Sequence, residues 1–325
     1  MKQLLFRIFL ILFFLLLILN PQTTVSGASA GLLLWFHSII PSLLPFMILS
    51  NLLVALNGIS LFTNLFYPLT SRLFGISKNG SYALLAGLVC GYPMGAKACA
   101  DLLKEQKISK AEAQYLLCFT NNPGPAFLSG YILQTLLKNA SPALPYFLSV
   151  YGAPLLFACV IHILQIFPKY TKISFFTKKE GGKPITPPFS PYVSSQELDF
   201  KLFDHAIMNG FETVTKLGGY IILFSILSAF IINLEFLDLK LKTLLLAITE
   251  ITTGSQFIST ASLYNATLKN AMLCACISFG GLSGIFQTKS VISDTSLNLL
   301  FYIGSKFFIS LLSALLYLCF STLIF

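Results

Sequence analysis

Long apolar runs alternate with short polar stretches along most of the chain. A membrane-spanning helix needs about 20 mostly apolar residues. Uninterrupted runs of this kind predict helices over residues 3–20, 31–56, 143–167, 207–233 and 297–324. Further apolar segments carry glycine or polar interruptions, and these cover residues 61–75, 81–103, 112–136, 243–262 and 269–291. The pattern predicts an all-α polytopic membrane protein.

One long polar stretch separates the apolar segments into two halves. Residues 168–201 are rich in Pro, Gly, Ser and Lys, which is typical of a solvated linker. A shift of 159 positions places Gly95 over Gly254 and Phe127 over Phe286, with little other identity. What recurs is a layout: a long helix, a re-entrant hairpin, an interrupted helix and a closing helix. The layout favours two repeats.

The distribution of Lys and Arg favours opposite orientations of the two halves. If Lys2 and Arg7 are cytoplasmic and 81–103 and 243–262 are re-entrant, about 15 of the 21 basic residues are cytoplasmic, as the positive-inside rule expects. Inverted repeats with interrupted helices are typical of secondary transporters that bind substrate near the midplane. The predicted units are a signal-anchor helix (1–30), a first repeat (31–167), a cytoplasmic linker (168–205) and a second repeat (206–325).

The composition agrees with a membrane protein and argues against several other classes of protein. Only 10% of residues are charged, against about a quarter in soluble domains. The net charge of +9 comes from basic residues spread over the loops, as the positive-inside rule expects. The aromatic residues interleaved with basic ones that a nucleic-acid site needs are absent. No HExxH, GxSxG or Walker motif occurs, and the closely spaced Cys274 and Cys276 have no His, Asp or Glu nearby in the sequence to complete a metal site. We therefore expect no enzyme activity, no catalytic residue, no cofactor and no metal.

The N-terminal segment has a second interpretation. Ala28–Ser29–Ala30 resembles a cleavage site after a basic start and an apolar run. The apolar run is long and the site lies several residues beyond it, which favours a retained anchor over a cleaved signal peptide.

The stretch FTNNPGPAFLSG, residues 119–130, is a poor membrane helix. Pro123 and Pro125 remove two hydrogen-bond donors, and Gly124 permits a sharp turn. Backbone groups freed in this way cost several kcal/mol in lipid unless protein or a water-filled cavity satisfies them. With the amides of Asn121 and Asn122, the stretch predicts an unwound binding site in the membrane. The alternative is a kinked helix whose asparagines bond a neighbour.

Three other segments carry candidate site residues. SFGGLSGIFQT, residues 278–288, offers small and polar groups, although close helix packing explains it equally well. In GYPMGAK, residues 91–97, Lys97 either faces a cavity or snorkels to the headgroups. Glu250 is surrounded by apolar sequence, so it is a candidate proton or sodium site, or the partner of a lysine. We expect Glu250 and Lys97 to face each other across the repeat interface.

The remaining membrane charges receive simpler interpretations. Glu212 and Lys216 are four residues apart and predict a helical ion pair. Lys306 has no partner nearby in the sequence and receives no role. The predicted substrate-binding residues are Gly91, Tyr92, Gly95, Lys97, Thr120, Asn121, Asn122, Gly124, Glu250, Thr252, Thr253, Ser255, Gly280, Gly281, Ser283 and Gln287.

Several motifs resemble one known family. GLVCGYPMGAK, LLCFTNNPGPAFLSGYI, TEITTGSQF and SFGGLSGIFQTKSVI, with IPSLLPFMILSNLL upstream, resemble the YlbJ family of sporulation integral membrane proteins, also called stage V sporulation protein V. The resemblance covers most of residues 31–320. It implies a carrier in the outer forespore membrane that delivers dipicolinic acid for spore cortex and core maturation. It also implies membership of the group with the nucleoside-recognition Gate domain.

These observations predict a multi-pass transporter of a small anionic metabolite. Its expected partners are the lipid bilayer, that substrate and a coupling ion, H⁺ or Na⁺, and the oligomeric state stays open. A nucleoside-type carrier is the alternative within transport. A non-transporting membrane scaffold for spore-envelope assembly is the alternative from a different class.

Overall fold

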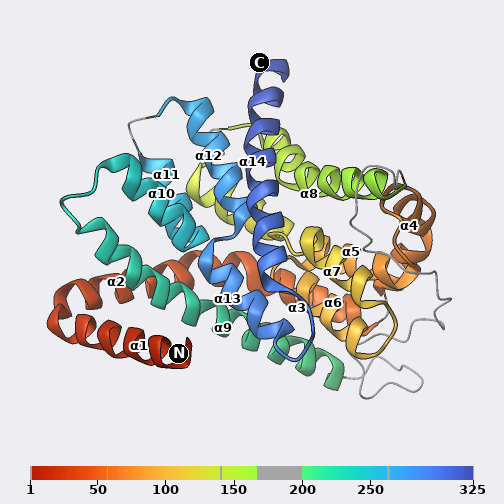
Figure 1. The fold of residues 1–325 in the computed structure, drawn as a ribbon, viewed down its shortest axis with the longest axis horizontal. Coiled ribbons are helices and arrows are strands. Elements are labelled where there is room, and N and C mark those ends of the chain that lie inside the picture. Colours follow the sequence, from red (N-terminus) through yellow and green to blue (C-terminus); the bar gives the residue numbers. More distant parts are fainter. Residues whose placement is uncertain (1, 57, 140, 167–199, 262–263, 325) are drawn as a thin grey trace.

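The computed structural model describes residues 2–56, 58–139, 141–166, 200–261 and 264–324, and the elements among them are helices (Figure 1). The first half contains α1 (Lys2–Leu19), α2 (Pro21–Leu34), the π-helical turn η1 (Trp35–Ile39), α3 (Ile40–Ala55), α4 (Gly58–Phe74), α5 (Lys78–Cys90), α6 (Met94–Lys104), α7 (Lys110–Thr120), the π-helical η2 (Phe127–Leu136) and α8 (Ala143–Ile166). The second half contains α9 (Phe200–Ile232), α10 (Leu239–Thr249), α11 (Ile251–Thr260), α12 (Ala266–Phe279), α13 (Gly281–Ile292) and α14 (Leu299–Ile324). The all-α prediction is confirmed.

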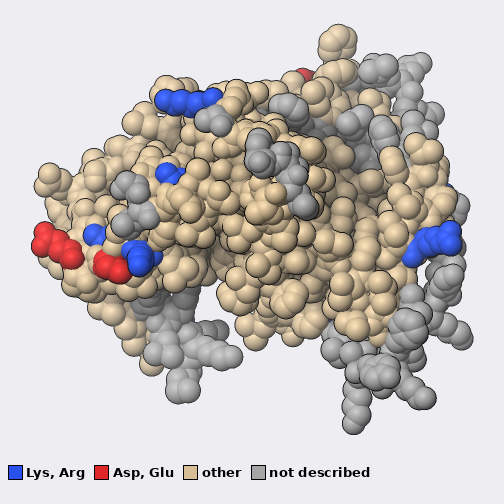
Figure 2. Space-filling view, turned by 90° about the horizontal axis from the view of Figure 1, so that it is seen from above, with Lys and Arg blue, Asp and Glu red and all other residues tan. Residues whose placement is uncertain are grey.

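Four helical segments of the described chain are long and apolar enough to cross a membrane. They are Ala143–Leu164, Phe200–Ile232, Ala266–Ile292 and Leu299–Thr322. A fifth arises if Leu10–Leu19 and Pro21–Ile39, which meet at 101°, form one broken span. Many exposed side chains on these helices are Leu, Ile or Phe, as lipid contact requires. In Figure 2 the described charged side chains lie toward the edges of the view, and the broad central face carries none.

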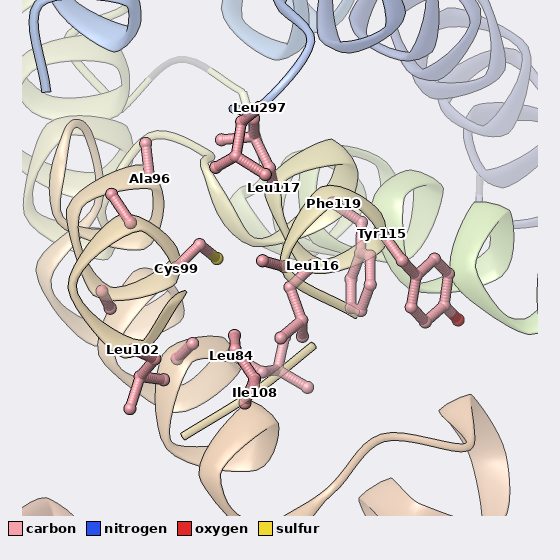
Figure 3. Close-up of a cluster of buried hydrophobic side chains, with 14 of the residues drawn as sticks. Leu84, Ala96, Cys99, Leu102, Ile108, Tyr115, Leu116, Leu117, Phe119 and Leu297 are labelled. Carbon is pink, nitrogen blue, oxygen red and sulfur yellow. The ribbon is translucent and has the colours of Figure 1, made fainter. Parts of the chain in front are cut away.

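Helix packing follows the long elements. In Figure 1, α14 runs through the centre of the molecule, and it packs against α12 and α8. The other long helix, α9, packs along α2 and α3. The small residues Gly27 and Gly31 of α2 allow this approach, because a Cβ at Gly27 would lie 2.9 Å from the Cα of Ile226. One buried core joins α5, α6 and α7, where Leu84, Leu102 and Leu116 meet (Figure 3).

Two segments fold back on themselves. A Cβ at Gly87 of α5 would lie 3.1 Å from the Cα of Gly95 in α6. A Cβ at Gly254 of α11 would lie 2.8 Å from the Cα of Ala247, although seven residues of straight helix span about 10 Å. This is the hairpin shape expected of 81–103 and 243–262. Their entry and exit on one face of the membrane stays a prediction.

The order of elements is similar in the two halves. A hairpin (α5 and α6), an interrupted helix (α7 and η2) and a long helix (α8) occur in the first, and α10 to α14 give the same order in the second. In both halves the second arm of the hairpin packs on the first part of the interrupted helix. The inverted relation between the halves remains a prediction. The predicted linker lies outside the described residues except for 200–205, which begin α9.

Candidate functional site

The tip of the first hairpin rests directly on the break in the neighbouring helix. Helix α7 ends at Thr120, residues 121–124 are not helical, and the π-helical η2 begins at Phe127. Cβ atoms at Gly87 and Gly95 would lie 2.2 and 2.3 Å from the carbonyl oxygen of Thr120. Gly91 has a φ of +75°, and its Cβ would lie 2.3 Å from the nitrogen of Gly124. Glycine is therefore required where the two backbones meet.

Asn121 joins this break to the second half of the chain. Its Nδ2 donates to Thr288 Oγ1 of α13 at 2.8 Å and to the Tyr302 hydroxyl of α14 at 3.0 Å. Its Oδ1 accepts from the backbone nitrogen of Ala96 at 3.3 Å. Asn121 is fully buried, and lipid offers its amide no hydrogen-bond partner. These protein groups therefore satisfy it instead.

A buried lysine that received no role from sequence completes the same junction. Lys306 of α14 is fully buried, and its Nζ donates to the carbonyl oxygen of Asn121 at 3.2 Å and to Oδ1 of Asn122 at 3.1 Å. The Nζ also lies 5.2 Å from the ring centroid of Tyr92, within cation–π range. Lys306 forms no salt bridge with any described carboxylate. Lys306 is therefore a buried amino group whose described contacts are two neutral oxygens and a ring.

Glu250 forms the break in the second hairpin. It lies between α10 and α11 in an extended conformation and caps the start of α11. Its Oε2 accepts from the backbone nitrogens of Thr252 and Thr253, both at 2.8 Å, and from both threonine hydroxyls. Its Oε1 is buried and has no hydrogen-bond partner. The carboxyl group is thus satisfied on one oxygen only.

The break between α12 and α13 brings the two halves together. Gly280 and Gly281 have φ values of +83° and +69°, which only glycine adopts readily. A Cβ at Gly281 would lie 3.1 Å from the Cα of Glu250. A Cβ at Gly280 would lie 2.7 Å from the hydroxyl of Tyr92, which comes from the tip of the first hairpin. That hydroxyl is buried and has no hydrogen-bond partner.

A cavity of about 60 Å³ lies at this meeting point. A water molecule needs about 10–15 Å³ by the same measure, so the cavity has room for a few waters. Apolar residues such as Leu43, Phe127 and Leu217 form much of its wall. Six predicted site residues also line it: Tyr92, Gly124, Thr252, Gly280, Ser283 and Gln287. Sequence segments about 190 residues apart therefore share one cavity wall.

Other predicted site residues have packing or capping roles instead. Gly95 and Thr120 form the close backbone contact described above. Ser255 lies 3.8 Å from the sulfur of Cys276, between α11 and α12. None of these three side chains is part of the cavity wall.

The expected ion pair between Lys97 and Glu250 is not formed. The hydrogen bonds of the Glu250 carboxyl all come from the first turn of its own helix. Lys97 instead interacts electrostatically with Asp101 and Glu212. The expectation was wrong because matching positions in two repeats do not fix which way a side chain points at a helix break. The predicted pair of Glu212 and Lys216 is confirmed, with Nζ and Oε1 2.5 Å apart.

Comparison with known proteins agrees with the motifs. Over 309 residues the chain is 27% identical to the sporulation integral membrane protein YlbJ of Bacillus subtilis (strain 168), and the match covers 86% of this chain and 72% of that protein. No family model and no solved structure matches the chain. The Gate-domain grouping therefore stays a prediction. With its apolar helices and this similarity, the chain is a multi-pass integral membrane protein that resembles the sporulation protein YlbJ over most of its length.

Proposed function

We propose that this protein carries a small anionic metabolite across a membrane and binds it where the broken helices meet. The observation that supports this most strongly is the buried ammonium of Lys306, which has no ion-pair partner among the described carboxylates. A lysine charge at the centre of a membrane helix costs at least about 3 kcal/mol on insertion scales. An anionic ligand supplies the missing counter-charge.

The start of α13 provides further donors for an anion. No side chain caps this helix, so its first amide groups have no partner within the helix. Gly280, Ser283 and Gly284 at this end line the cavity. Helix N-termini with free amides bind carboxylates and phosphates readily. The site therefore combines these amides with a lysine whose Nζ lies 5.2 Å from the ring centroid of Tyr92, a residue of the cavity wall.

The family resemblance supports dipicolinic acid as the cargo. At neutral pH this molecule is a planar aromatic dianion, so one carboxylate can pair with Lys306 while the other meets the α13 amides. Tyr92 and Phe127 provide aromatic faces for its ring. The cavity holds only a few waters, so a ring of this size enters once the broken segments move apart. This motion is the opening that a carrier requires.

We place this activity in sporulation. The relative is named as a sporulation integral membrane protein, and transport of dipicolinate across the outer forespore membrane would give this chain a role in spore cortex and core maturation. The buried amino group of Lys306 has no ion-pair partner among the described carboxylates, which favours an anionic cargo over a neutral nucleoside.

Uptake into liposomes tests this proposal. Purified protein in liposomes should accumulate labelled dipicolinate and not uridine. Lys306→Met keeps a long apolar side chain but removes the charge, so uptake should fall at least about tenfold, the equivalent of one charged hydrogen bond. Lys104→Gln is the control, because Lys104 is an exposed residue that pairs only with exposed Asp294.

Three results would contradict the proposal. Uptake of uridine in preference to dipicolinate would indicate the nucleoside-type carrier. Uptake of neither compound by well-folded protein would favour a scaffold. Equal dipicolinate uptake by wild type and Lys306→Met would remove the buried cation from the mechanism.

A further inference from the structure

The two oxygens of the Glu250 carboxyl have very different surroundings. Oε2 accepts four hydrogen bonds from Thr252 and Thr253, whereas Oε1 accepts none, although the residue is fully buried. A carboxylate has two equivalent acceptor oxygens, and a buried one gains by satisfying both. A protonated carboxyl group has one acceptor oxygen and one hydroxyl oxygen. Protonation of Oε1 replaces an unpaired charged oxygen with a neutral hydroxyl group, which costs less free energy to bury without a partner, so the asymmetry favours the protonated form.

The groups around Glu250 supply no counter-charge. Helices α9, α10, α12, α13 and η2 pack against α11. The ionisable groups that face Glu250 from them, within the described chain, are the phenol of Tyr131 on η2 and the thiol of Cys276 on α12. Both are neutral at physiological pH. An ionised Glu250 would therefore be an isolated negative charge in the interior of a membrane protein, at high cost in free energy.

Two further orphan groups lie at or near the α12–α13 break. The hydroxyls of Ser278 and Tyr92 are buried without hydrogen-bond partners. Ser278 lies two residues before Gly280, which packs on the Tyr92 hydroxyl, and the next residue, Gly281, packs on the backbone of Glu250. Hydroxyl groups accept as well as donate hydrogen bonds, so a rearrangement of the break can offer the Oε1–H group an acceptor. Polar groups of this kind, kept buried and unpaired, call for a functional explanation.

We propose that Glu250 is the proton-binding site of the carrier, and that one proton crosses with each substrate anion. A proton from water on the acidic side forms the Oε1–H bond. The same bond breaks to water on the other side when the helix breaks open and hydrate the carboxyl group. No electron is transferred, and the four bonds to Oε2 hold the carboxyl in place in both states. The coupling of the proton to anion transport rests on the proposed carrier function. The presence of a proton on Glu250 does not depend on that function.

Infrared difference spectroscopy tests the proton directly. Wild-type protein at neutral pH should show the C=O stretching band of a buried protonated carboxyl, separate from the backbone amide bands. Glu250→Gln should lack this band, while Glu212→Gln, which alters an exposed and ion-paired carboxylate, should keep it. Raising the pH on wild-type protein should remove the band reversibly, which provides the same test without any variant.

Uptake under a pH gradient tests the coupling. With the membrane potential clamped, lowering the outside pH by one unit should raise dipicolinate accumulation by about tenfold, because one coupled proton contributes a factor of ten. In Glu250→Gln, accumulation should not change with the outside pH, whereas Glu212→Gln should respond as wild type does.

The outcomes separate this inference from the carrier proposal. The infrared band without any dipicolinate uptake would leave the proton site standing and refute the proposed cargo. Absence of a Glu250-dependent band would overturn the inference. So would tenfold stimulation that survives in Glu250→Gln, or uptake driven by a sodium gradient and indifferent to pH.

Discussion

At the scale of single residues, Asn121 does the most to join the two halves. Its side chain contacts the backbone of α6 and hydroxyl groups on α13 and α14, and its carbonyl oxygen accepts from Lys306. The residue is fully buried at the point where α7 stops. Replacement therefore leaves several buried polar groups unsatisfied at once.

Asn121→Ala should destabilise the protein and abolish uptake while the protein still inserts in the membrane. Three lost side-chain bonds at about 1 kcal/mol each predict a loss of about 3 kcal/mol in the free energy of unfolding. Thermal unfolding of purified protein in detergent measures this loss. Asn233→Ala removes a single bond from an exposed asparagine and should change stability by less than about 1 kcal/mol. An equally small effect at Asn121 would contradict its role at the junction.

The predictability of these residues depended on whether their partners were close in sequence. The prolines and asparagines of 119–130 marked the break, because breaking a membrane helix is a local property. Lys306 received no role, because its two hydrogen-bond acceptors lie about 185 residues earlier. Its position inside a long apolar helix was the only indication of a role in the sequence, and this position does not identify the residues that it contacts.

At the scale of elements, the helix breaks depend on glycines with special backbone geometry. Gly280 combines a φ of +83° with close approach to Tyr92. The left-handed conformation costs other residues about 1–2 kcal/mol, and any Cβ would also displace the Tyr92 hydroxyl. Gly219 of α9 offers the opposite case, since nothing lies within 4 Å of its Cβ position.

Gly280→Ala should therefore lower the thermal unfolding temperature and reduce dipicolinate uptake. Gly219→Ala, in a regular helix with free space, should leave stability unchanged or raise it by about 0.5–1 kcal/mol. Adding Tyr92→Phe to Gly280→Ala removes the nearest atom and should restore part of the lost stability but not the part due to φ. A Gly280→Ala protein as stable as wild type would mean that this break is not held in the described conformation.

Hydropathy predicted the fully apolar helices well and the packed polar ones poorly. The bounds of α1, α8 and α14 lie within two residues of the apolar runs. Helix α2 starts at Pro21, ten residues before the run that predicted it. Its extra turns contain Gln, Thr, Ser, Ala and Gly, and they are helical because Pro21 suits a first helical position and small residues pack closely on α9. Such packing is invisible to a hydropathy pattern.

At the scale of the whole molecule, the elements form a frame around one buried polar junction. Helices α9 and α14 each pack along long helices, and their outer faces are apolar. Among the described residues, the fully buried side chains of Lys, Arg, Asp or Glu are Lys306 beside the α7 break and Glu250 at the α10–α11 break. A charge on either side chain costs free energy inside a membrane unless a ligand or a proton compensates it. The arrangement therefore supports the proposed carrier for an anion and a proton.

Equilibrium binding of labelled dipicolinate to purified protein in detergent, measured for wild type and Lys306→Met, tests the anion site most directly. We predict saturable binding to wild type and affinity at least about tenfold weaker in the variant, because a charged hydrogen bond contributes about 1.5–3 kcal/mol. Lys104→Gln should bind as wild type does. Equal affinity in wild type and Lys306→Met would contradict the assignment of the buried cation to the cargo.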